Sequence, residues 1–200
     1  MTSIKSLAVF CGSNTGNDPR YAADAKALAK AIYSHSIHLI YGGAKVGLMG
    51  VLADTLLELG GQVTGVMPQS LVDIEVAHES LGAFHVVKTM AERKDLMAEL
   101  SDGFIMLPGG AGSLDEFFEM MTWSQLSFHE KPCAILNSGG YYDHLLKFLD
   151  HSVSEGFIKT VHRDMIIVEE QAEPLIEGLF AYRHPMEKKW IKDDTRDPSK

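Results

Sequence analysis

The chain has 200 residues, a formal net charge of −9 and only two cysteines. This length fits one domain with one sizeable core, and the acidic balance disfavours nucleic-acid binding, which normally needs a basic surface. Because Cys11 and Cys133 each lie at or in an apolar run, we expect buried reduced thiols and a cytoplasmic protein. No apolar run is long enough for a signal peptide or a membrane span, so no membrane partner is expected.

Short apolar runs rich in β-branched residues alternate with amphipathic stretches along the chain. The expected strands, in chain order, are residues 6–10, 37–41, 62–67, 84–87, 103–108, 132–137 and 165–170. This alternation predicts a doubly wound, Rossmann-like α/β fold with a mostly parallel sheet. Residues 1–182 form the single predicted domain, and the polar residues 183–200 are expected to be a flexible tail.

Glycine-rich segments follow three of the expected strands. They are CGSNTG at 11–16, YGGAKVGLMG at 41–50 and PGGAGS at 108–113. The carboxyl ends of parallel strands share one edge of the sheet, where open α/β sheets bind their ligands. Glycine backbones and helix N-termini offer N–H donors to an anion. We therefore predict that the three segments line one pocket for a small phosphate-containing ligand.

The segment PGGAGSLDE at 108–116 leaves two interpretations open. It joins an expected strand to the helical pattern FFEMMTWSQL, so a phosphate would fit at the start of that helix. However, Ser113 and Glu116 also match the S-x-x-E capping box, in which a hydroxyl and a carboxylate only satisfy the amide groups of the helix itself. The segment alone does not decide between them.

Familiar cofactor motifs are incomplete in this chain. Gly47 is followed by Leu48 and Met49, so the run from Gly43 does not complete G-x-x-x-x-G-K-[ST], which argues against a P-loop NTPase. Neither PGGAGS nor CGSNTG forms a dinucleotide fingerprint, which disfavours a nicotinamide enzyme. The histidines lack the cysteine or carboxylate spacing of a metal site. Neither a metal nor an organic cofactor is expected.

A cluster of charges, TMAERKDLM at 89–97, follows the strand expected at 84–87. Arg93 and Lys94 stand near the start of an expected helix, where cations are electrostatically unfavourable. The cluster could be a solvated charged face. Because it follows a strand, Arg93 is also expected near the glycine segments, where a guanidinium could grip phosphate or ribose oxygens.

The pair TMAERK and PGGAGSLDE, supported by YGGAKVGLMG, resembles the LOG (Lonely Guy) family of cytokinin riboside 5'-monophosphate phosphoribohydrolases. The family hallmark is PGG-x-GT-x-x-E with an upstream M-x-x-RK. The resemblance implies that residues 1–182 are a nucleotide-binding catalytic domain. Its reaction would be hydrolysis of the N-glycosidic bond of a purine nucleoside 5'-monophosphate, with adenine or an N6-substituted adenine as the base. A homodimer without a cofactor is also implied.

The resemblance assigns roles to individual residues. Arg93 and Glu116 take the catalytic positions. The residues that would bind the substrate or its phosphate are Gly42, Gly43, Glu75, Met90, Lys94, Gly109, Gly110, Gly112, Ser113 and Thr122. Two positions depart from the pattern. Ser113 replaces the motif threonine but keeps the hydroxyl, and Ala83 stands where many relatives have glutamate, which bears on base preference more than on catalysis.

Two other functions remain open from the sequence. Some relatives were labelled lysine decarboxylases, and a pyridoxal-phosphate enzyme needs a lysine for its Schiff base, for which Lys45 is a candidate. A non-catalytic nucleotide carrier or sensor could also use this scaffold, since fold does not fix function.

Overall fold

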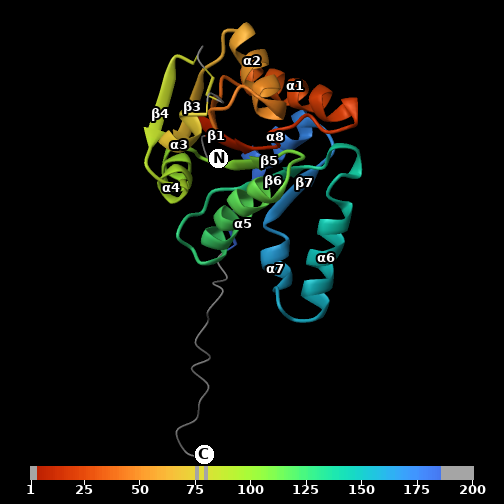
Figure 1. Cartoon of the computed structure of the whole chain (residues 1–200). Coiled ribbons are helices and arrows are strands. Elements are labelled where there is room, and N and C mark those ends of the chain that lie inside the picture. Colours follow the sequence, from red (N-terminus) through yellow and green to blue (C-terminus); the bar gives the residue numbers. More distant parts are fainter. Residues whose placement is uncertain (1–3, 75–76, 79–80, 186–200) are drawn as a thin grey trace, which may run out of the picture.

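The computed structural model describes residues 4–74, 77–78 and 81–185 (Figure 1). Its strands form one sheet in the order β4-β3-β2-β1-β5-β6-β7, and all neighbouring strands are parallel. The strands are β1 (Ser6–Phe10), β2 (His38–Tyr41), β3 (Val63–Pro68), β4 (Ala83–Val87), β5 (Phe104–Met106), β6 (Cys133–Leu136) and β7 (Ile166–Glu169). Each lies within or next to a predicted range, and the Rossmann-like α/β class is confirmed.

Helices alternate with the strands on both faces of the sheet. They are α1 (Pro19–Ser34), α2 (Gly47–Glu58), α3 (Gln69–Val72), α4 (Met90–Leu100), α5 (Ala111–Gln125), α6 (Asp143–Ser154), α7 (Thr160–Arg163), α8 (Ala172–Ala181) and the 3-10 helix η1 (Ser138–Gly140). None of these helices, within the residues described, is long and apolar enough to cross a membrane. Residue 75 and the tail residues 186–200 lie outside the described part.

The central strand β1 is buried on both of its faces. Leu7 and Val9 belong to a core shared with α1, α2 and α8, whereas Ala8 and Phe10 belong to a second core with α4, α5 and α6. Figure 1 shows α1 and α2 on one side of the sheet and α4 and α5 on the other. Two buried faces explain why the strand sequences are apolar without clean alternation.

The direction of winding reverses at β1, because β2 to β4 extend from one of its edges and β5 to β7 from the other. Such a switch point opens a crevice at the carboxyl ends of the strands. Two backbone hydrogen bonds join the loops there. The N–H of Gly12 donates to Pro108 O (3.0 Å), and the N–H of Leu48 donates to Gly12 O (3.0 Å). The three glycine segments therefore meet at one edge, as the sequence predicts.

Candidate functional site

A cavity of about 540 Å³ opens at this edge of the sheet. Its walls come from the loops that follow β1 and β2, from the end of β3 and α3, and from the first turns of α4 and α5. The lining residues are Cys11, Gly12, Ser13, Gly42, Ala44, Val46, Met49, Met67, Leu71, Ile74, Met90, Arg93, Gly110, Ala111, Gly112, Ser113, Asp115 and Glu116.

A buried ion pair joins the two helices in the wall of the cavity. Nη1 of Arg93 on α4 donates to Oε1 of Glu116 on α5 at 2.5 Å, and the two side chains are only 10% and 9% exposed. The Arg93 Nε–H donates to the carbonyl oxygen of Val66 in β3 at 3.0 Å. Arg93 is therefore held by the sheet as well as by α5, and its guanidinium has a fixed place.

Burial and charge act in opposite directions on Glu116. Burial raises the pKa of its carboxyl, because the ionised form loses contact with water, and the positive charge of Arg93 opposes that rise. Burial also raises the pKa of the Cys11 thiol, which lines the same cavity. The thiol is neutral at physiological pH, so the chemistry available here is that of the Arg93 and Glu116 pair.

The start of α5 rules out one of the two interpretations of PGGAGSLDE. The N-cap of α5 is Gly110, and no side chain of the described residues bonds to that cap. Ser113 lies inside the helix and Glu116 bonds to Arg93, so the capping-box interpretation is wrong here. The N–H groups of the first turn have no intrahelical acceptor, and residues 110–113 line the cavity. This is the geometry in which a helix start receives an anion.

The capping motif lies instead at the start of α4. The Thr89 hydroxyl accepts from the N–H of Glu92 at 3.1 Å, and the Glu92 carboxylate accepts from the N–H of Lys88 at 2.8 Å. The sequence carried this signal as T-x-x-E at 89–92. This cap fixes the beginning of the helix that carries Arg93.

The structure brings most of the predicted site residues together. Those that line the cavity are Gly42, Met90, Arg93, Gly110, Gly112, Ser113 and Glu116. Gly109 lines the neighbouring pocket. Gly43 lies beside the cavity, where its oxygen accepts from the N–H of His78 at 2.8 Å.

Two predicted residues lie elsewhere, and a third is not among the described residues. Nζ of Lys94 contacts Asp115 (3.1 Å) and Glu119 (2.6 Å), so Lys94 braces α4 against α5. Thr122 is exposed two turns along α5 from Glu116 and lines a separate cavity beside α6 and α7. Glu75 lies outside the described residues.

Comparison with known proteins identifies the relatives of this chain. The family model described as "Possible lysine decarboxylase" matches residues 49–179. The cytokinin riboside 5'-monophosphate phosphoribohydrolase of Rhodococcoides fascians is 47% identical over 88% of this chain and 89% of its own length. The enzyme of the same name, LOG5, of Arabidopsis thaliana is 42% identical over 90% of this chain and 79% of its own length. The chain belongs to the LOG family.

Solved structures of other proteins share the fold of this LOG family member. The molybdenum cofactor binding protein of Rippkaea orientalis superimposes with a TM-score of 0.68 at 18% identity, over 90% of this chain and 98% of that one. The Moco carrier protein of Chlamydomonas reinhardtii gives a TM-score of 0.66 at 19% identity, over 88% and 97%. At these identities the likeness concerns the fold alone.

The described lysines of this LOG protein do not fit a pyridoxal-phosphate site. Among the described residues that line the cavity there is no lysine. Lys45 is exposed, and Lys94 is engaged by two carboxylates. A Schiff base needs a lysine amine that reaches the cofactor, and none of the described lysines is placed for it in this cavity.

The sequence missed the apolar wall of the cavity. Met49, Met67, Leu71, Ile74 and Met90 come from four different segments, and of these only Met90 was predicted to contact the substrate. Single apolar residues in separate segments give no local signal, since they look like ordinary core positions. They become one surface only when the sheet is assembled.

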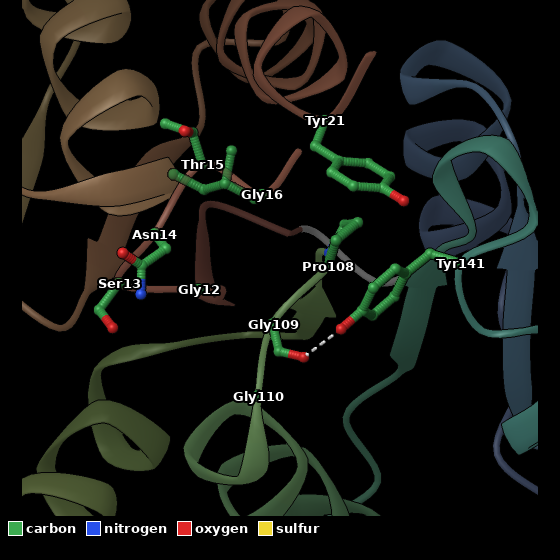
Figure 2. Close-up of a pocket in the computed structure, with 11 residues that line it drawn as sticks. Gly12, Ser13, Asn14, Thr15, Gly16, Tyr21, Pro108, Gly109, Gly110 and Tyr141 are labelled. Atoms are coloured by element: carbon green, nitrogen blue, oxygen red, sulfur yellow. Dashed lines mark hydrogen bonds between the residues drawn. The ribbon is translucent and has the colours of Figure 1, made fainter. Parts of the chain in front are cut away.

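A neighbouring pocket of about 250 Å³ shares Gly12, Ser13 and Gly110 with the cavity. Figure 2 shows it between the loop that follows β1 and two aromatic rings, Tyr21 and Tyr141. The two pockets therefore lie on either side of a shared strip of glycine-rich backbone.

We expect Gly42→Ala to lower the free energy of unfolding by about 2 kcal/mol or more, because displacing one partner of a buried ion pair is costly. A methyl group at Gly42 would overlap with Nη2 of Arg93. The guanidinium would have to leave Glu116 to make room. Chemical denaturation measures the change.

The matched control is Gly82→Ala, where a methyl group meets nothing within 4 Å. We expect a change within about 0.5 kcal/mol there. Equal effects of the two substitutions would contradict the tight fit between Gly42 and Arg93.

Proposed function

We propose that this protein hydrolyses the N-glycosidic bond of a purine nucleoside 5'-monophosphate and releases the free base and ribose 5-phosphate. The observation that carries the proposal is the buried pair of Arg93 and Glu116 beside the uncapped start of α5, in one cavity. Relatives with 42–47% identity bear the name of this activity.

The start of α5 is the binding site for the 5'-phosphate in this proposal. Its first-turn N–H groups and the Ser113 hydroxyl can donate to phosphate oxygens, and the helix dipole favours the negative charge. Ser113 can thus donate the hydrogen bond that the threonine usual in the family would donate, because both residues carry a hydroxyl. Binding energy from this remote group can be used to orient and distort the sugar at C1'.

Glu116 is the group that acts on the reacting carbon. By analogy with glycosides, the bond breaks through an oxocarbenium-like sugar, which a nearby carboxylate stabilises. Arg93 engages Oε1, and among the described residues no hydrogen bond is made to Oε2. Oε2 is therefore the atom that faces the sugar or orients the water that adds to C1'. The bonding electrons and a proton go to the nitrogen of the leaving base.

Arg93 keeps Glu116 in place and favours its ionised form. Its charge opposes the rise in the Glu116 pKa that burial causes. Its own contact with Val66 prevents the guanidinium from following the carboxylate when the substrate binds. The pair is thus preorganised, which reduces the reorganisation needed in the transition state.

The apolar wall of the cavity receives the base. Met49, Met67, Leu71, Ile74 and Met90 offer flexible, polarizable contact to a purine face and to an apolar substituent. A cavity of about 540 Å³ is of the size that holds a small-molecule ligand. These contacts support adenine or an N6-substituted adenine as the base.

The experiment that tests the function is product analysis with AMP, N6-substituted AMP and the matching nucleosides. We expect free base from the nucleotides and a far lower kcat/KM for the nucleosides, since these lack the phosphate handle. Glu116→Gln should nearly abolish release and keep the fold. AMP binding without release of adenine would instead indicate a carrier or sensor. Equal kcat/KM values for AMP and adenosine would contradict a contribution of the 5'-phosphate to catalysis.

We expect Arg93→Lys to lose most turnover and also to lower the melting temperature, because part of a buried ion pair is lost. An ammonium keeps the charge but cannot donate to Val66 and Glu116 from one planar group. The neighbouring Lys94 is the control, because it carries the same charge but does not line the cavity, and it contacts Asp115 and Glu119 instead. Lys94→Ala should have a milder effect, mainly on KM. Wild-type kinetics in Arg93→Lys would move the reacting centre away from α4.

We also propose that the protein is a homodimer. Thr122 lies on α5 in a cavity that includes the 87% exposed Phe157, and Phe128 and Phe148 are likewise exposed. Exposed apolar side chains of this kind are typical of surfaces that bind a partner. Contact with a second copy would cover them and would place Thr122 at an interface between subunits.

Sedimentation at micromolar concentration should give twice the mass of the chain, and Phe157→Glu should shift the equilibrium towards monomer. Tyr33→Glu is the control, because Tyr33 is exposed at the end of α1, away from this surface. A monomeric wild-type protein would contradict the dimer. The same loss of mass in both variants would place the interface elsewhere.

Cytoplasmic location is proposed from the cysteines. Cys11 and Cys133 are both free and buried, and burial raises the pKa of the Cys133 thiol to about 12. Unpaired thiols suit a reducing compartment.

A further inference from the structure

The loop between β5 and α5 is fixed by hydrogen bonds to three of its own consecutive carbonyl groups. Each of them accepts a hydrogen bond from a different donor. The bonds are Tyr142 Oη–H to Leu107 O (2.8 Å), Gly12 N–H to Pro108 O (3.0 Å) and Tyr141 Oη–H to Gly109 O (2.8 Å). The last of them is the dashed line in Figure 2. Two adjacent tyrosines thus secure one side of this loop.

The peptide between Gly109 and Gly110 is the most easily rotated part of the loop, because neither residue has a Cβ to restrict it. In a trans peptide the C=O and N–H groups point in opposite directions, and the described residues contain no cis peptide. The bond that holds the Gly109 oxygen towards Tyr141 therefore directs the Gly110 N–H away from Tyr141. A rotated peptide would present an oxygen in place of that donor.

We propose that Tyr141 is a positioning residue for the phosphate-binding loop. Its hydroxyl fixes the peptide between Gly109 and Gly110, so that the Gly110 N–H is available to the 5'-phosphate of the substrate. Gly110 lines the main cavity as well as the neighbouring pocket, so this donor stands at the boundary between them. The inference rests on the proposed function, which supplies the phosphate.

The surroundings of Tyr141 support this role over a role in the core. Its ring is 42% exposed and meets Tyr21 and Tyr142 edge to face, with centroids 5.5 and 4.8 Å apart. These contacts orient the ring, while the hydroxyl makes the bond to the loop. The pocket of about 250 Å³ beside it leaves space for the peptide to rotate once that bond is lost.

The neighbouring Tyr142 provides a matched control. Its hydroxyl makes a bond of the same length to the Leu107 oxygen, but the next residue is Pro108, which has no N–H. Fixing that carbonyl therefore directs no donor towards a ligand. The Tyr142 hydroxyl also meets the backbone N–H of Gly109, but Gly12 holds that same peptide through the Pro108 oxygen. Tyr142 is 3% exposed, so its contribution is to the stability of the fold.

The test compares the wild type with Tyr141→Phe and Tyr142→Phe. In Tyr141→Phe we expect the KM for AMP to rise about three- to tenfold, as for the loss of one hydrogen bond, with kcat within about twofold. The calorimetric Kd for AMP should rise by the same factor when each tyrosine variant is combined with the non-hydrolysing Glu116→Gln. Inhibition by inorganic phosphate should weaken by the same factor. In Tyr142→Phe the melting temperature should fall, while the KM, the Kd and the inhibition by phosphate stay unchanged.

The outcomes separate this inference from the proposed function. A wild type that hydrolyses AMP, with Tyr141→Phe unchanged in KM and Kd, overturns the positioning role alone. A wild type that binds AMP without hydrolysing it overturns the hydrolase, and the Kd values still decide on Tyr141. A wild type that binds neither AMP nor phosphate overturns both. Equal rises in KM in the two variants would contradict the positioning role and would mean that Tyr141, like Tyr142, only stabilises the fold.

Discussion

The ion pair between Arg93 and Glu116 is the interaction on which the site depends. Two charges that are about nine-tenths buried are stable only when each compensates for the other and both are held in place. The chain meets this requirement by bringing α4 and α5 together over the edge of the sheet and by tying Arg93 to β3. Lys94, which does not line the cavity, joins the same two helices a second time through Asp115 and Glu119. The absence of a side chain at Gly42 then leaves room for the guanidinium.

Most of the fold could be predicted from the sequence because the signals are local. Each strand is a short apolar run, and the strands are separated by helical patterns, so the periodicity alone indicated a parallel sheet. The convergence of the glycine segments followed from topology, since the ends of neighbouring parallel strands must meet. Gly12 and Pro108 are almost a hundred residues apart in sequence, and the hydrogen bond between them confirms that these segments meet.

The details of the site were less predictable because they depend on tertiary contacts. Ser113 and Glu116 have capping-box spacing, but α5 begins at Ala111, and a buried arginine from another helix engages the glutamate. The same spacing at Thr89 and Glu92 does form a cap, since there the threonine stands just before the helix. Sequence spacing is identical in the two cases, and only the position of the helix start distinguishes them.

The place of β1 in the sheet has a consequence for how the chain acquires its structure. Ala8 pairs with Phe104, so one edge of the first strand has no partner until the chain has been extended by almost a hundred residues. Contacts over such separations carry a large loop-closure cost and slow the folding reaction. A nascent chain that ends after β4 exposes this apolar edge, which could pair with another chain. Synthesis of β5 closes the edge, and the same step brings the loop with Gly109 and Gly110 against Gly12.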